Sequence, residues 1–191
     1  PAGTARAVAR GLTMGGGMVP EMARVTTRYD RVQDRFSLAG ELPQGLPVVL
    51  WLTQRLLLRL LPPLLAWLQE HDAPPQHQPL QHLYAETLQG FAQQAACAGL
   101  EPQAPVAVQA VSPEWLVESI DLAHGPAGVR LVFLGRQGPV AAMAMPAQAL
   151  RQWLGIVCHA WREAPWRIEP WPAWLVEAGG GAGAPQAGAV H

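Results

Sequence analysis

The sequence predicts an α+β fold made of two units, each with three short strands followed by an amphipathic helix. Residues 24–52 contain short runs rich in β-branched and aromatic side chains, separated by turn-forming residues. Residues 53–70 place apolar side chains at helical spacing, and residues 115–161 repeat this order of elements. A chain of 191 residues is long enough to form one domain with a sizeable core.

The first unit is expected to contain three strands, RVTTRYD, DRFSLAG and PVVLWL. The loop ELPQGL, with its proline and glycine, separates the second strand from the third. Because side chains alternate along a strand, Arg24, Thr26 and Arg28 share one face, which we expect to be exposed to solvent.

The next segment, LWLTQRLLLRLLPPLLAWL at residues 50–68, is the most apolar in the chain and could be a membrane span, a partner-binding helix or a core helix. On a helical wheel its leucines occupy one arc of roughly 200°, while two arginines and two prolines occupy the rest. A charged residue in the bilayer centre costs about 2.5–3.5 kcal/mol, which argues against a span. We expect one amphipathic helix, capped by Thr53 and bent at Pro62 and Pro63, that lies on a sheet.

The second unit repeats this order with WLVESIDLA, VRLVFLG and VAAMAM, followed by the helix PAQALRQWLGIVCHAW, which begins at Pro146. The offsets between matching elements stay near 92–96 residues. We interpret the recurrence as an internal duplication, supported by order and spacing rather than by identical residues. Chance recurrence of a common arrangement is the alternative.

The helical wheel also assigns faces to the second helix and to a third helix between the units. The second helix is expected to bury Leu150, Trp153, Leu154, Val157, Cys158 and Trp161. It is expected to expose Arg151, Gln152, His159 and Arg162. The third helix, which ends at Gly99, is expected to bury a stripe made of Leu80, Leu83, Tyr84, Leu88, Phe91 and Ala95. A further short strand is expected at PVAVQAV, residues 105–111.

These elements are expected to form a single domain over residues 22–175. Its parts are unit one at 22–71, the linker and middle helix at 72–104, and unit two at 105–175. The Gly- and Ala-rich ends, 1–21 and 176–191, are expected to be disordered tails.

The composition excludes several chemistries. All thirteen basic residues are arginine, and the chain has neither lysine nor asparagine, as a GC-rich genome would favour. Without lysine there is no Schiff base and no P-loop lysine, and without asparagine there is no N-glycosylation acceptor. The net charge of −1 creates no long-range field toward nucleic acid or anionic lipid.

No metal or cofactor site is predicted. Cys97 and Cys158 form no C-x-x-C pair, and Cys158 is expected to be a buried, inert thiol. The histidines His71, His77 and His82, with Asp72, have no metal-ligand spacing, so we interpret them as part of a solvated loop. The N-terminus lacks the apolar run of a secretory signal, which favours a cytoplasmic location.

The first hairpin is one candidate site. Arg24, Arg28 and Arg35 could bind an anion or single-stranded nucleic acid, with Tyr29 or Phe36 stacking on bases. Acidic residues interleave with these arginines, so a salt-bridged solvent face is the alternative that we favour.

The segment WREAPWRIEPWPAW is the other candidate, because its prolines prevent one regular helix. Its candidate partner-binding residues are Trp166, Arg167, Trp171 and Trp174, since Trp and Arg are frequent in interface hot spots. The alternatives are a strap that closes the domain's own core, and a sugar or cation site.

No catalytic centre is evident, since no serine lies in a G-x-S-x-G elbow and the GGG runs lack the context of a phosphate loop. Glu118 and Asp121 could pair with Asp30 and Asp34 across the units, but the sequence does not show that they converge. We expect a non-enzymatic accessory, assembly or adaptor protein without a cofactor, acting through sheet edges or the tryptophan segment. Its partner would be another protein, or a second copy in a homodimer, rather than a membrane or nucleic acid. The alternatives are a single-stranded nucleic-acid module and a small-molecule domain with a pocket between sheet and leucine helix.

Overall fold

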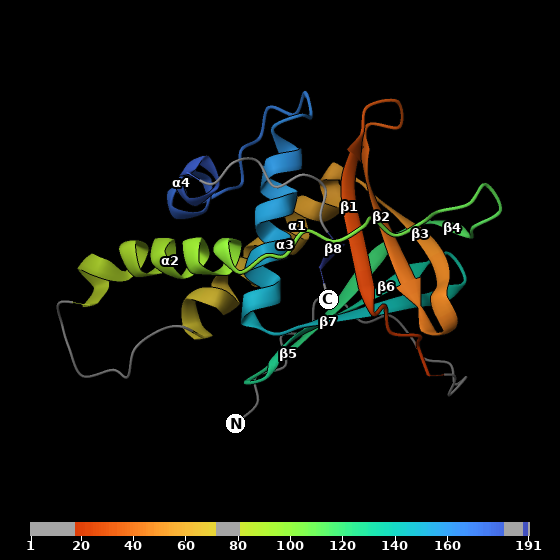
Figure 1. Cartoon of the computed structure of the whole chain (residues 1–191), viewed down its shortest axis with the longest axis horizontal. Coiled ribbons are helices and arrows are strands. Elements are labelled where there is room, and N and C mark those ends of the chain that lie inside the picture. Colours follow the sequence, from red (N-terminus) through yellow and green to blue (C-terminus); the bar gives the residue numbers. More distant parts are fainter. Residues whose placement is uncertain (1–17, 72–80, 182–188, 191) are drawn as a thin grey trace.

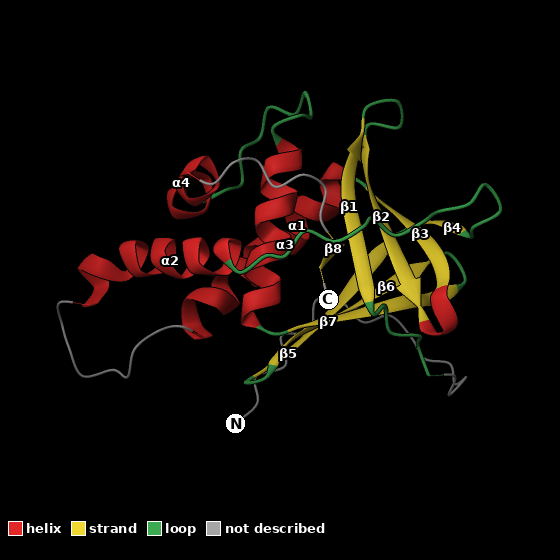
Figure 2. Ribbon diagram, viewed as in Figure 1, coloured by secondary structure: helices red, strands yellow, loops and turns green. Residues whose placement is uncertain are grey.

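The computed structural model describes residues 18–71, 81–181 and 189–190 (Figure 1). The backbone alone is described for 81–84, 179–181 and 189–190. Helices gather on one side of the molecule and strands on the other (Figure 2). The predicted α+β fold class is confirmed.

The first meander consists of β1 (Arg24–Asp30), β2 (Arg35–Leu42) and β3 (Leu46–Leu52), with the short 3-10 turn η1 (Pro43–Gly45) before β3. The strands are antiparallel, and Asp30 lies opposite Arg35 at the first turn. Asp34 closes that turn with a positive φ of 49°, which aspartate tolerates better than most residues. The three strands occur where the residue pattern predicts them.

The second meander consists of β5 (Ser119–Gly125), β6 (Gly128–Gly135) and β7 (Gly138–Met145). The strand expected from residue 115 to 123 is divided, because β4 (Glu114–Leu116) pairs in parallel with β3 of the first sheet instead. Backbone bonds explain the division, since Val117 N donates to Trp51 O and Glu118 N donates to Leu134 O. The chain therefore crosses from one sheet to the other within two residues.

Short segments extend both sheets. The first sheet has the order β4-β3-β2-β1-β8, in which β8 (Ala189–Val190) pairs with β1. In the second sheet, Glu21 forms a parallel bridge with Ala142 on the outer side of β7. The described structure therefore begins before residue 22, and α4 (Ala173–Gly181) continues past residue 175, so each predicted tail includes residues with a defined structure. Residues 1–17, 182–188 and 191 lie outside the described residues.

The helix α1 (Gln54–His71) is continuous through both prolines, whose side chains are exposed. Leu56 N donates to Thr53 Oγ1 at 3.3 Å, as expected for an N-terminal cap. Within the described residues, no helix is both long enough and apolar enough to cross a membrane.

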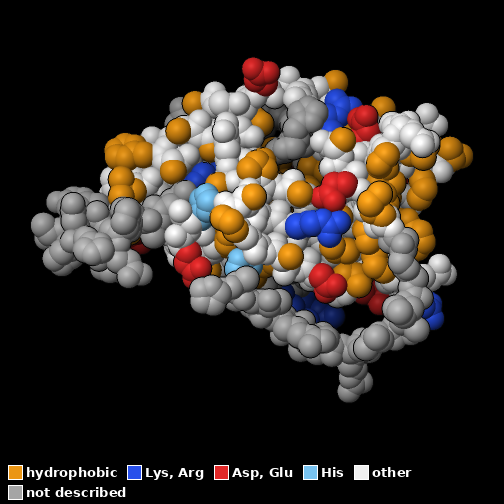
Figure 3. Space-filling model, turned by 90° about the horizontal axis from the view of Figure 1, so that it is seen from below, with side chains coloured by type: hydrophobic (Ala, Val, Ile, Leu, Met, Phe, Trp, Pro, Cys, Tyr) orange, Lys and Arg blue, Asp and Glu red, His pale blue; other side chains and the backbone are white. Residues whose placement is uncertain are grey.

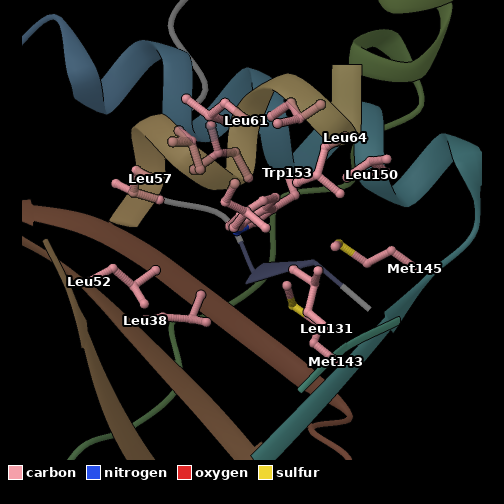
Figure 4. Packing of buried hydrophobic residues seen from close by; sticks show 14 of the residues in the cluster. Leu38, Leu52, Leu57, Leu61, Leu64, Leu131, Met143, Met145, Leu150 and Trp153 are labelled. Carbon is pink, nitrogen blue, oxygen red and sulfur yellow. The ribbon is translucent and has the colours of Figure 1, made fainter. Parts of the chain in front are cut away.

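One hydrophobic core joins the two sheets. Leucines of α1 and Trp153 of α3 (Ala147–Trp161) point into the space between the two sheets (Figure 4). Leu38 and Leu52 approach from the first sheet, and Leu131 and Met143 from the second. Trp153 is fully buried, and its Nε1 donates a hydrogen bond to Thr27 Oγ1 at 3.0 Å. This hydrogen bond connects α3, which follows the second meander, to β1 of the first meander.

Residues 105–111 do not form the predicted strand. They run across the outer face of β1, where Val106 N donates to Thr26 Oγ1 at 2.9 Å and the Arg24 guanidinium donates to Ala104 O at 3.1 Å. Thr26 is consequently buried, so the outer face of β1 is not exposed along its length as expected.

Candidate partner-binding surfaces

The tryptophan segment closes the protein's own core. Trp171 and Trp174 are buried, and Trp171 packs edge-on against Trp161 with ring centres 5.7 Å apart. Of the predicted partner-binding residues, only Arg167 is exposed, while Trp166 is partly buried. Trp171 Nε1 has no hydrogen-bond partner among the described residues. The arrangement matches the strap that the sequence offered as an alternative.

A hydrogen-bond network holds the tryptophan segment to the first hairpin. Asp34 Oδ1 accepts hydrogen bonds from Trp166 Nε1 at 2.8 Å and from the Tyr29 hydroxyl at 2.6 Å. The Tyr29 and Trp166 rings meet edge to face at 5.5 Å. Burial, together with the Asp34 carboxylate, raises the pKa of Tyr29 to about 12. Tyr29 therefore stays protonated, and keeps this bond, at physiological pH.

The arginine hairpin does not present three free cations. Arg24 forms an ion pair with Glu41 at 2.7 Å, and Arg35 lies opposite Asp30 in the strand register, while Arg28 is exposed. The two rings expected to stack on bases, Tyr29 and Phe36, belong to the aromatic cluster beneath the strap. The hairpin thus resembles the salt-bridged face that the sequence favoured over a nucleic-acid platform.

The helix α2 (Gln81–Ala98) is turned the opposite way to the prediction. Leu88 and Phe91 are 48% and 62% exposed, whereas Gln89 and Gln93 are only 7% and 1% exposed. Ala95 is also exposed. The other members of the expected stripe, Leu80, Leu83 and Tyr84, lie outside the described side chains.

A buried arginine on α3 causes this orientation. Arg151, expected outside, is 3% exposed, and its guanidinium donates to Gln89 O at 3.5 Å and to Gln89 Oε1. Gln93 Nε2 donates to Arg151 O at 2.9 Å, and the guanidinium also lies over the Trp174 ring at 5.4 Å. A buried guanidinium needs acceptors, and Gln89 supplies its backbone and side-chain oxygens, while Gln93 donates to the backbone of Arg151. The polar face of α2 therefore turns inward.

Gly155 allows the close approach of α2, whereas Gly90 leaves room for a methyl group at ordinary contact distance. A methyl group at Gly155 of α3 would lie 3.2 Å from Gln93 Nε2 and 3.5 Å from Cys97 Sγ. A methyl group at Gly90 would lie 3.8 Å from Cβ of Trp174 on α4. Gly155, four residues after Arg151, is the signal in the sequence that could have indicated a packed rather than an exposed face.

The strand β5 is the open edge of the second sheet. The two meanders have four outer edges, and three of them carry an added segment: β8 on β1, β4 on β3, and Glu21 on β7. No strand of the described residues pairs with the outer edge of β5. All of its side chains are at least partly exposed. Viewed from below, the molecule shows acidic, basic and hydrophobic side chains interspersed (Figure 3).

An open hollow of about 370 Å³ lies at the end of the β5–β6 hairpin. Its lining comes from residues 123–130 of the hairpin and residues 144–146 before α3, and is mostly apolar. Arg130 lies in this lining and is paired with Glu21 at 3.1 Å. This hollow is not the pocket between sheet and leucine helix that the small-molecule alternative expected.

The carboxylates weighed for catalysis are separated by the fold. Asp30 accepts hydrogen bonds from the amides of Val32 and Gln33 in the first hairpin. Glu118 instead lies directly before β5, and Asp121 lies within it. No hydrogen bond or ion pair between described residues joins the two sets. Among these residues, no group of three histidine, cysteine or acidic side chains could hold a metal ion. His71 stacks on Trp67, while Asp72, His77 and the side chain of His82 lie outside the described part.

The two thiols are expected to differ sharply in reactivity. Burial raises the pKa of the Cys158 thiol from 9.0 to about 11, whereas Cys97 is partly exposed and accepts a bond from Gln93 Nε2. At pH 8 a disulfide reagent should therefore modify one thiol quickly and the second only on unfolding. Cys97→Ser should abolish the fast phase and Cys158→Ser should keep it, and the reverse result would contradict this placement.

The raised pKa also gives Cys158 a pH-dependent contribution to stability. The thiol is protonated in both states below pH 9, so its contribution is complete there, and it is lost between pH 9 and 11 as the unfolded chain ionises first.

No protein-family model, curated protein or solved structure matches this chain.

Proposed function

We propose that this protein is a non-enzymatic accessory or adaptor protein that binds an extended segment of another protein by strand addition at β5. The open edge of β5, beside three meander edges that are each paired, is the observation that carries the proposal. In strand addition, backbone hydrogen bonds supply affinity and side-chain pockets supply specificity.

The opposite edge of the same sheet illustrates the contact. Met22 N donates to Ala142 O and Ala142 N donates to Pro20 O, both at 2.8 Å, so an extended segment already docks in parallel on β7. The ion pair between Arg130 and Glu21 accompanies it. A partner segment on β5 would form the equivalent contact on the other side of the sheet.

The proposed internal duplication supports the same edge. In a duplicated pair of meanders, β5 corresponds to β1, because each is the first strand of its unit. The outer edge of β1 is occupied by β8. Among the described residues, the corresponding edge of β5 has no such strand, and a partner would supply it.

The strand itself carries little of the usual protection of an exposed edge. Its seven residues, SIDLAHG, contain no proline, and Asp121 is the one acidic residue, while α1 contacts β5. The adjacent hollow is lined mainly by alanine, proline, valine and methionine side chains, so it suits a small apolar side chain of the bound segment.

Proline scanning of two neighbouring residues tests the proposal. Successive strand amides point alternately toward β6 and away from it, so one of Ala123→Pro and His124→Pro removes an outward amide and the other breaks the ladder. Both side chains are exposed. We expect the variant that retains the wild-type melting temperature to lose the proteins that immobilised wild type captures from extracts of its source cells.

Ala107→Pro, in an exposed loop, is the matched control and should capture the same proteins as wild type. Capture of no protein by wild type, or identical capture by wild type and the stable β5 variant, would contradict strand addition at this edge.

A further inference from the structure

The helix α2 presents an uncharged apolar stripe to solvent. Leu88, Phe91 and Ala95 lie within an arc of about 60° at the helical repeat of 3.6 residues per turn. The first two side chains are 48% and 62% exposed. Both α3 and α4 pack on the opposite side, at Gln93 and Gly90, and α2 lies on the side of the molecule away from the sheets (Figure 1). The described residues therefore leave the stripe open.

The absence of charge on this stripe restricts what it can bind. From Ala85 to Gly99, Glu86 is the one charged side chain, and it lies about 160° from Leu88 around the helix. A two-fold interface brings the same face of each copy together, so a face that carries charges of one sign would repel its own copy. An uncharged face meets its own copy without that repulsion, and the net charge of −1 adds little.

We propose that two copies of the chain form a dimer through antiparallel α2 helices, related by a two-fold axis between Phe91 and Ala92. About this axis, Leu88 faces Ala95 of the second copy, and Phe91 faces Ala92 of the second copy. Each large side chain then meets an alanine, so the two faces interdigitate. A parallel pair would instead place Phe91 against Phe91 and Ala95 against Ala95, leaving crowded and empty layers.

The contact between two α2 helices is small. An α2 of eighteen residues is about 27 Å long. One helix from each copy gives an interface at the small end of specific contacts, below about 1,200 Å² in total. Weak and transient complexes have interfaces of this size, so we expect a reversible dimer.

Sedimentation velocity of the full chain over a concentration series tests the dimer. Wild type should shift from monomer to dimer as concentration rises. The double variant Leu88→Ser/Phe91→Ser should raise the dissociation constant about 100-fold or more, because both large side chains leave the contact. Both are exposed in one chain, so the variant keeps its fold. The matched control Val32→Ser/Val111→Ser removes two side chains that are 92% and 85% exposed elsewhere, and should dimerise as wild type does.

Disulfide trapping tests the orientation in a Cys97→Ser background. A mixture of Leu88→Cys and Ala95→Cys chains should cross-link on oxidation, and Ala95→Cys alone should not. Three results would each overturn the proposal: a wild-type monomer at all concentrations, a dimer that the double serine variant leaves unchanged, or efficient cross-linking of Ala95→Cys with itself.

Discussion

A Trp153→Ala variant is expected to lose about 3–5 kcal/mol of unfolding free energy. The indole is fully buried and points between the two sheets, so its removal leaves a large cavity (Figure 4). It also leaves Thr27 Oγ1 without the hydrogen bond that Trp153 Nε1 donates at 3.0 Å. Urea unfolding at neutral pH, followed by far-UV circular dichroism, measures the loss.

Two companion variants separate the causes. Trp153→Phe retains most of the apolar volume but loses the donor, and should cost about 1–3 kcal/mol. Trp166→Ala also removes a tryptophan, but one that is only partly buried, and should cost less than Trp153→Ala. If Trp153→Ala changed stability by less than about 1 kcal/mol, a single core between both sheets and α3 would be wrong.

Arg151→Leu is expected to cost about 2–4 kcal/mol, because hydrogen bonds from a charged group contribute about 1.5–3 kcal/mol each. The change removes the donors to Gln89 and the contact with the Trp174 ring, and leaves Gln89 Oε1 buried without that partner. The largest effect should be local, since α2 is held to α3 through this network. Urea unfolding gives the magnitude, and amide exchange in α2 shows where stability is lost.

Arg167→Leu is the matched control, because it removes the same charge from an exposed position. It should change stability by less than about 0.5 kcal/mol. Equal effects of the two substitutions, or unchanged amide exchange in α2 of Arg151→Leu, would contradict the inward orientation of the glutamines.

Local patterns were sufficient to predict the two meanders and the helices that follow them. Alternation in VRLVFLG and the leucine stripe of α1 arise from contacts between neighbours in sequence, and both occur as expected. The strand RVTTRYD also forms, but its outer face does not alternate in exposure, because Thr26 is buried. The same reasoning failed for 115–123, because the pairing of Glu114–Leu116 with β3 is a contact between residues far apart in the chain.

The orientation of α2 could not be predicted from hydrophobicity. Leu88 and Phe91 form the more apolar stripe, but the buried guanidinium of Arg151 requires acceptors, and Gln89 provides them through its backbone and side chain. A helical wheel treats arginine as exposed, so it misplaces Arg151 on a helix α3 whose apolar face is otherwise buried as expected, and it turns α2 the wrong way round.

The sequence could predict the kind of candidate site, a sheet edge, but not which edge it would be. Sheet edges were expected to bind a partner, but which edge stays open depends on where β4, β8 and Glu21 add, and none of these short pairings has a local signature. The tryptophan-rich segment was the more prominent candidate in the sequence. Its residues Trp171 and Trp174 are buried in the protein's own core, so they are not exposed for a partner.

Amide hydrogen exchange along Ser119–Gly125 tests the open edge most directly, because each amide reports whether its backbone is paired. In the free protein, alternate amides of β5 should exchange at least as fast as those of frayed termini, while the amides between them, and those of β6, stay protected. Addition of a captured partner protein should then slow the fast set. Uniform protection of β5 in the free protein, or fast exchange that the partner leaves unchanged, would contradict strand addition at β5.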